Sequence, residues 1–205
     1  MAVDLTEIDA LLFDLGGVVI DIDFSRVIDM WAQRSNTDPS EIASRFSMDE
    51  AYRRHEVGQI DGPAYFESLR ASLAIDLSDR DFVDGWLEVH VGLIDGIQDV
   101  LALAARSWPL FGFTNSNPTH RNVAIVRFAD VLRHFDRVFE SFAIGLRKPE
   151  REAFEFVADS MGVPLGRILF FDDSPENVTG ARDCGMPAVL VRSTDDIRSA
   201  LGLTD

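Results

Sequence analysis

The sequence has little cysteine, no long hydrophobic run and no basic residues among its first ten positions. Cys184 is the single cysteine among 205 residues, so no disulfide can form within the chain, and a reducing compartment fits best. No apolar run approaches the ~20 residues that cross a bilayer. Asp4, Glu7 and Asp9 stand where a secretory signal would carry basic residues. We therefore expect a cytoplasmic location and no membrane partner.

Positive charge is also scarce. The chain holds 35 acidic and 19 basic residues, which gives a formal net charge of −16. Such a field repels nucleic acid and anionic membranes, so we expect neither as a partner. A small anionic substrate is still allowed, because one local cation can dominate a small pocket. The sequence leaves the oligomeric state open between a monomer and a homodimer.

Two patterns divide the chain. From about residue 93, short apolar runs alternate with helical stripes, which predicts a parallel sheet with helices on both faces. The expected strands are 10–15, 109–113, 137–140, 168–171 and 188–191. Residues 20–92 instead carry helical spacing, with a helix over 24–35 and a capping box at Ser47-Met48-Asp49-Glu50, and contain no convincing strand. We predict an α/β fold: a doubly wound parallel core (1–19 and 93–205) with an α-helical insert (20–92).

Polar residues follow three of the expected strands. Asp14 ends the first apolar run, Thr114 ends the second, and Asp172 with Asp173 ends a later one. Because the carboxyl ends of parallel strands meet at one edge of a sheet, these side chains are expected to converge. Three carboxylates together repel one another unless a cation joins them, and oxygen ligands favour Mg²⁺. Asp172 and Asp173 can also be read more simply, as caps of the helix that follows.

The remaining parts of the pattern suit a phosphate. Lys148 supplies a point charge; it could be a solvated surface lysine, but its place just before a proline and a helix start argues otherwise. Gly16 and Gly17 let the backbone approach an anion closely. An aspartate such as Asp14 can attack phosphorus and form an aspartyl-phosphate. The set therefore favours phosphoryl transfer, in which positioning and charge stabilisation carry the catalysis.

Taken in order, these stretches resemble the haloacid dehalogenase superfamily of phosphohydrolases from about residue 8 to about residue 192. Asp14 matches the first motif, Thr114 the second, Gly145-Leu146-Arg147-Lys148-Pro149 the third and Asp172-Asp173 the fourth. The resemblance implies a Rossmann-like core and identifies the helical insert as a C1-type cap, which closes over the site and selects the substrate.

The resemblance also implies roles. Asp14 would be the nucleophile, with Lys148 as the second catalytic residue. The Mg²⁺ ligands would be Asp14, the backbone carbonyl of Gly16, Asp172 and Asp173. The substrate would contact Leu15, Gly16, Thr114, the amide of Asn115, Lys148 and His55, although His55 can also be an ordinary residue of an amphipathic cap helix.

One position departs from the family pattern. Most phosphatases of the family carry an acid/base aspartate two positions after the nucleophile, where this chain has Gly16. A missing general acid costs about 10²- to 10⁴-fold in rate. Either another acid acts, or the leaving group needs less help, or the protein is not a phosphatase. Residues 13–24 and 55–60 resemble a subgroup with glycine here that includes bacterial α-D-glucose-1-phosphate phosphatases, and we expect His55 or Asp23 to reach the leaving oxygen.

The main interpretation is a Mg²⁺-dependent phosphomonoester hydrolase acting through an aspartyl-phosphate on a small phosphorylated metabolite, with a hexose 1-phosphate first in line. One alternative is a 2-haloacid dehalogenase, in which the aspartate attacks carbon and no metal is needed. The other is a non-catalytic pseudophosphatase that binds a phosphometabolite or a protein partner, which Gly16 keeps open.

Overall fold

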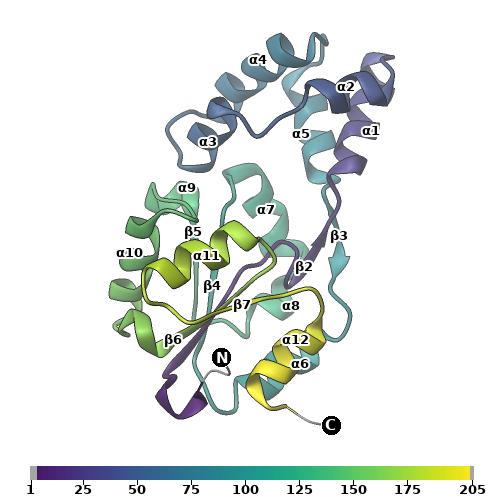
Figure 1. Cartoon of the computed structure of the whole chain (residues 1–205). Coiled ribbons are helices and arrows are strands. Elements are labelled where there is room, and N and C mark those ends of the chain that lie inside the picture. Colours follow the sequence, from purple (N-terminus) through teal and green to yellow (C-terminus); the bar gives the residue numbers. More distant parts are fainter. Residues whose placement is uncertain (1–3, 204–205) are drawn as a thin grey trace.

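The computed structural model describes residues 4–203 and shows a core with a helical cap above it (Figure 1). The core sheet has five strands in the order β5-β4-β1-β6-β7, and every neighbouring pair is parallel. The strands are β1 (Ala10–Phe13), β4 (Leu110–Thr114), β5 (Arg137–Glu140), β6 (Ile168–Asp172) and β7 (Ala188–Leu190). All four residues of the central β1 are buried, as expected of a strand covered on both faces. The predicted parallel α/β core is confirmed.

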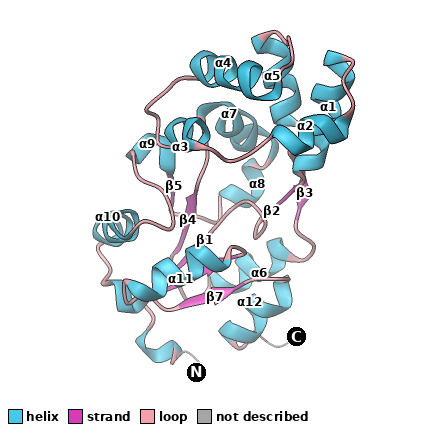
Figure 2. Ribbon diagram, turned by 45° about the horizontal axis from the view of Figure 1, so that its top comes forward, coloured by secondary structure: helices cyan, strands magenta, loops and turns pink. Residues whose placement is uncertain are grey.

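Helices cover both faces of this sheet. In β1, Leu11 and Phe13 pack with one group of helices and Leu12 with the other, because successive side chains point to opposite faces. The first group comprises α6 (Ile97–Ala104), α8 (Ala129–Leu132) and α12 (Thr194–Leu201), and the second α10 (Arg151–Met161) and α11 (Pro175–Asp183). Figure 2 shows these helices around the strands. The doubly wound arrangement is therefore present.

The cap has a hydrophobic core of its own. It consists of α1 (Phe24–Ser35), α2 (Pro39–Arg45), α3 (Glu50–Glu56), α4 (Gly62–Leu73) and α5 (Asp79–Leu87). Trp31 and Trp86 stack at its centre, with ring centroids 5.3 Å apart. The capping box predicted at Ser47 is wrong by two residues: Asp49 caps α3, because its carboxylate accepts the Tyr52 amide at 2.9 Å.

Two short strands join the cap to the core, where no strand was expected. β2 (Ile20–Ile22) leaves the core and pairs antiparallel with β3 (His90–Leu93), which returns to it. Both are only three or four residues long and carry Asp21 and Gly92, so they lack the apolar run that marks the core strands. Pairing satisfies backbone groups of two segments that must run side by side.

The remaining helices lie near the upper edge of the sheet as drawn in Figure 1. They are α7 (Pro118–Arg127) and α9 (Ser141–Ile144), and two 3₁₀ turns occupy Leu5–Glu7 and Leu165–Arg167. Among residues 4–203, none of the helices has the length and apolar character needed to cross a membrane.

Candidate active site

Three carboxylates meet at the carboxyl edge of the sheet. β1 and β6 pair with Phe13 opposite Phe171, so Asp14 and Asp172, the next residues, lie side by side. Asp173 follows directly. One oxygen from each of these side chains lies within 4.8 Å of the others, an arrangement that can hold a metal ion. The convergence expected from the polar strand ends is therefore present.

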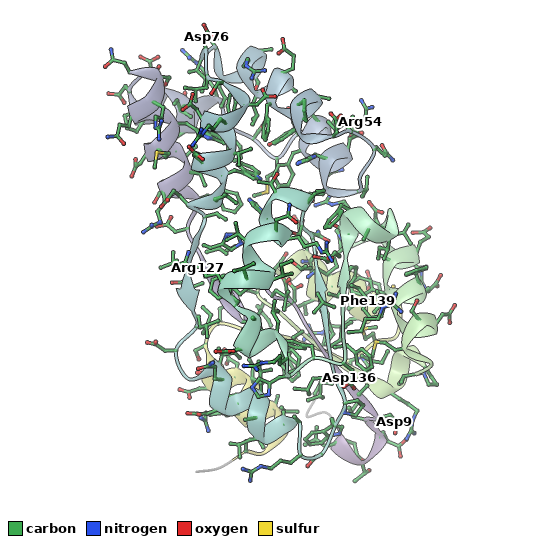
Figure 3. All side chains as sticks on the ribbon, turned by 180° about the vertical axis from the view of Figure 1, so that it is seen from behind. Asp9, Arg54, Asp76, Arg127, Asp136 and Phe139 are labelled. Atoms are coloured by element: carbon green, nitrogen blue, oxygen red, sulfur yellow. The ribbon has the colours of Figure 1, made fainter. Side chains whose placement is uncertain are left out.

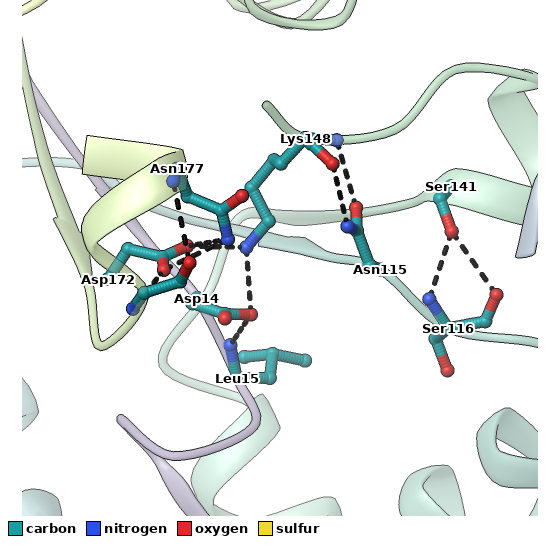
Figure 4. Close-up of polar contacts among 9 residues, drawn as sticks. Asp14, Leu15, Asn115, Ser116, Ser141, Lys148, Asp172 and Asn177 are labelled. Carbon is teal, nitrogen blue, oxygen red and sulfur yellow. Dashed lines mark hydrogen bonds and ion pairs between the residues drawn. The ribbon is translucent and has the colours of Figure 1, made fainter. Parts of the chain in front are cut away.

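The ammonium group of Lys148 lies between two of these carboxylates. Its Nζ is 3.0 Å from Asp14 Oδ1 and 2.7 Å from Asp172 Oδ2, and its side chain is fully buried (Figure 4). Burial alone lowers the pKa of Lys148, but the two carboxylates outweigh it and raise the pKa above the usual range. Lys148 is thus a buried ammonium group paired with two carboxylates, and the surface-lysine reading does not apply.

The positive charge of Lys148 does not by itself offset the factors that disfavour the ionised carboxylate of Asp14. Its Oδ1 accepts the amide of Leu15 at 2.6 Å and contacts Lys148. Burial raises the pKa of the Asp14 carboxyl, Asp172 and Asp173 act in the same direction, and Lys148 alone opposes them. A further cation beside these oxygens would favour the ionised form that a nucleophile needs. The donor set, made of oxygens only, suits Mg²⁺.

Asp172 and Asp173 differ in their surroundings. Asp172 is fully buried, and besides Lys148 it accepts the Ser174 amide at 2.8 Å and the Asn177 side-chain amide at 3.0 and 3.1 Å. Asp173 is exposed and approaches Gly17 so closely that a Cβ there would lie 2.2 Å from its Oδ2. Asn177 was not singled out from the sequence, where it appears only as a residue in the first turn of a helix.

A side-chain clamp holds the loop that carries Lys148. Asn115 accepts the Lys148 amide through Oδ1 and donates to the Lys148 carbonyl through Nδ2, both at 3.0 Å (Figure 4). The Lys148–Pro149 peptide bond is cis. Asn115 was expected to act through its backbone amide, so this side-chain role was missed. No local sequence signal links the two residues.

A cavity of about 580 Å³ lies between these groups and the cap. Asp14, Leu15, Gly16, Thr114 and Lys148 form its floor. The cap and the upper edge of the core contribute the walls, which include Phe24, Met48, Tyr52, Arg53, Glu56, His120, Arg121, Ile125 and Arg147. Apart from His55, the residues predicted to contact the substrate therefore face one cavity.

The structure does not bring His55 or Asp23 to this cavity. His55 is 2% exposed, its ring stacks on Tyr65 with centroids 4.8 Å apart, and its Nδ1 lies 3.2 Å from the carbonyl oxygen of Ile60. Asp23 instead caps α1, accepting the Ser25 amide at 2.9 Å. Both placements argue against the expectation that either side chain reaches a leaving oxygen.

A pair that the sequence did not reveal lines the cavity wall. Glu56 of the cap and Arg147 of the core form an ion pair of 3.0 Å. Burial raises the pKa of the Glu56 carboxyl, while Arg147 and the hydroxyl of Tyr52 lower it. The two partners are far apart in the sequence, so no spacing rule could join them.

Residues 8–185 match the haloacid dehalogenase-like hydrolase family, and the chain belongs to that family. Among curated relatives, a drimenol cyclase of Aspergillus calidoustus is 29% identical over 75% of this chain, which spans 27% of that protein. The rat bifunctional epoxide hydrolase 2 is 35% identical over 36% of this chain, which spans 13% of it. The chain thus spans about a quarter or less of these first relatives. A D-ribitol-5-phosphate phosphatase of Bacteroides thetaiotaomicron is 22% identical over 93% of this chain and 95% of its own length.

Solved structures share the fold. A family member from Bacteroides thetaiotaomicron, crystallised as a magnesium complex, superposes with a TM-score of 0.82 at 24% identity and covers 97% of this chain and 100% of its own. An L-2-haloacid dehalogenase from Xanthobacter autotrophicus gives a TM-score of 0.67 at 18% identity, covering 88% of this chain and 76% of its own. These likenesses confirm the Rossmann-like core with its inserted helical cap.

Proposed function

We propose that this hydrolase is a Mg²⁺-dependent phosphomonoesterase that acts through an aspartyl-phosphate on a small phosphorylated metabolite. The observation that carries the proposal is the buried ammonium of Lys148, which bridges Asp14 and Asp172 at the floor of a capped cavity. Asp14 Oδ1 is occupied by Leu15 and Lys148, whereas Oδ2 has no protein hydrogen bond within residues 4–203. Oδ2 is therefore the oxygen that would attack.

The metal would be held by Asp14, Asp173 and the carbonyl of Gly16. Asp172 is less suited to direct ligation, because its oxygens already contact Lys148, Ser174 and Asn177. We infer that Asp172 mainly anchors Lys148. A bound Mg²⁺ would neutralise charge on the phosphate and on the crowded carboxylates.

The chain's own residues suggest the course of the reaction. Asp14 attacks phosphorus, a P–O bond to Asp14 forms, and the P–O bond to the organic group breaks, so that the organic group leaves as an alkoxide and takes a proton from solvent. Lys148 and the amides near Thr114 and Asn115 balance the charge on the phosphoryl oxygens. Water then cleaves the aspartyl-phosphate, which releases inorganic phosphate and restores Asp14.

Gly16 limits the choice of leaving group. No carboxylate occupies that position, so the departing oxygen receives less help from the protein. A hemiacetal oxygen, as in a hexose 1-phosphate, leaves more readily than the oxygen of a primary alcohol. This chemistry is the support for placing hexose 1-phosphates first.

The test is phosphate release from a panel that pairs glucose 1-phosphate with glucose 6-phosphate and includes ribitol 5-phosphate. We expect release that needs Mg²⁺, stops with EDTA, prefers the 1-phosphate and falls at least about 10³-fold in Asp14→Asn. A preference for the 6-phosphate would contradict the leaving-group argument alone. Silence across the panel would favour a phosphometabolite-binding protein, and EDTA-resistant halide release from a 2-haloacid would favour a dehalogenase.

A further inference from the structure

The cap meets the core on two opposite sides of the cavity. On one side lies the β2–β3 ribbon, where Arg127 of α7 donates to the carbonyls of His90 and Val91, both at 2.7 Å. Figure 3 shows Arg127 at this junction, and Figure 1 places α3 and α9 on the other side. The ribbon side carries both chain connections. The α3–α9 side is held by non-covalent contacts only, so that side can separate without unfolding either part.

The α3–α9 contact centres on a buried charge pair. The carboxylate of Glu56 lies 3.0 Å from the guanidinium of Arg147, and these side chains are 5% and 16% exposed. Two charges removed from water are stable there only while they remain paired. Opening the cap breaks the ion pair and returns both groups to water, so the pair opposes opening only by the excess of its attraction over that hydration.

Backbone contacts around the pair fix its geometry. The hydroxyl of Ser141, which is fully buried, donates to the Glu56 carbonyl at 2.6 Å and accepts the Ser116 amide at 2.9 Å. Gly58 lies against α9 so closely that a Cβ there would be 2.6 Å from the Phe142 carbonyl oxygen. The end of α3 thus fits the start of α9 in one arrangement, with Glu56 facing Arg147.

Arg147 is the residue immediately before Lys148. Its guanidinium contacts the cap, while the ammonium of Lys148 contacts Asp14 and Asp172. Two neighbouring residues of one loop are therefore held, Arg147 by the cap and Lys148 by the carboxylates of the core. If Glu56 moves away with the cap, the loop that carries Lys148 loses one of these contacts.

We propose that Glu56 and Arg147 form a latch that holds the cap closed and keeps the Lys148 ammonium between Asp14 and Asp172. Glu56 is then a positioning residue, acting through Arg147. The kinetic part of this inference rests on the proposed phosphatase function, whereas the closure of the cap does not.

The first test is hydrogen exchange on the full-length protein without substrate. Glu56→Gln removes the charge and keeps the shape, and Glu50→Gln, an exposed residue of the same helix, is the matched control. We expect amides within 50–58 and 141–148 to exchange about tenfold faster in Glu56→Gln only. Equal exchange in the two variants would overturn the latch. If Glu56→Gln fails to fold, Arg147→Lys, which keeps the charge but loses the planar guanidinium, takes its place.

The second test is kinetic. We expect Glu56→Gln to lower kcat about tenfold and to change KM less, because the phosphate contacts themselves remain. Arg147→Gln should lose a similar factor, Arg147→Lys should recover part of it, and the double variant should be no worse than either single one. Faster exchange with an unchanged kcat would overturn the positioning role. If the wild type hydrolyses no phosphate ester, the proposed function fails, and the exchange comparison still decides the latch.

Discussion

Asn115 and Lys148 are joined by two hydrogen bonds of 3.0 Å, from the side-chain amide of one residue to both main-chain polar groups of the other. The Asn115 side chain therefore satisfies the backbone N–H and C=O of Lys148, as a neighbouring strand does at the edge of a sheet. It links the end of β4 to the loop that delivers the ammonium group. The position of Lys148 is thus set from two sides, by Asn115 at its backbone and by carboxylates at its side chain.

The clamp predicts a kinetic defect with a small loss of stability. Asn115→Ala removes both bonds, and each ordinary hydrogen bond contributes about 1 kcal/mol net. We expect kcat for phosphate release to fall about tenfold, because the ammonium is no longer held within a fraction of an ångström. Steady-state kinetics and urea unfolding check the two effects. An unchanged kcat would mean that the carboxylates alone position Lys148.

The close approach of Gly17 and Asp173 predicts a metal-affinity defect. A Cβ at Gly17 would lie 2.2 Å from Asp173 Oδ2, so Gly17→Ala must displace that carboxylate. Gly145→Ala is the control, since its φ of 74° matches the 75° of Gly17 while nothing lies within 4 Å of its Cβ position. Both variants should lose about 1 kcal/mol through backbone strain. Only Gly17→Ala should need about tenfold more Mg²⁺ for half-maximal activity. An equal shift in both variants would show that Asp173 does not bind the metal.

Much of the core followed from local sequence signals. Asp14 and Asp172 were placed together because each ends a buried apolar run, and parallel strands bring such ends to one edge. Helix starts such as Asn117-Pro118 and Ser174-Pro175 were also readable, since the capping residue and the proline are neighbours in the chain. Each of these predictions depends on residues within a few positions of one another.

The parts that the sequence did not reveal depend on long-range contacts. β2 and β3 become strands only because the chain leaves and re-enters the core at one place. The pairing of Glu56 with Arg147 has no local signal at all. His55 was expected to contact substrate, but periodicity could not tell which face of α3 points to Tyr65 and which to the cavity. Such features require the fold before they can be seen.

Removal of the Asn177 side chain is expected to weaken the site at Asp172, the carboxylate that pairs with Lys148. The Asn177 amide donates to both oxygens of Asp172, at 3.0 and 3.1 Å. Hydrogen bonds to a charged group contribute about 1.5–3 kcal/mol, so Asn177→Ala should lower the free energy of unfolding by roughly that amount. Asn177→Asp, of the same shape but negatively charged, should be worse for both stability and kcat. Urea unfolding and kinetics of the pair decide this, and an Asp variant better than Ala would contradict the role.

The position of His120 implies that the free energy of unfolding depends on pH. Its ring stacks on Trp86 with centroids 5.2 Å apart, and its Nε2 lies 3.2 Å from the Trp86 carbonyl oxygen. Burial lowers the pKa of His120 to about 3, and the neighbouring His90 acts in the same direction. In the unfolded chain the pKa is about 6.5. Between these values the unfolded chain binds a proton that the folded protein does not, so stability is retained above pH 6.5 and falls as the pH drops.

The expected contribution is about 1.4 kcal/mol per pH unit below about pH 6. His120→Gln removes it, so the variant, less stable than the wild type at pH 8, should lose less on acidification. Urea unfolding at pH 8, 6 and 5 measures the narrowing gap between the two proteins. The ring protons of His120 give an independent check by NMR, because they should report a neutral imidazole at pH 5. A titration of His120 centred near its unfolded value would show that the stack on Trp86 leaves the ring open to water.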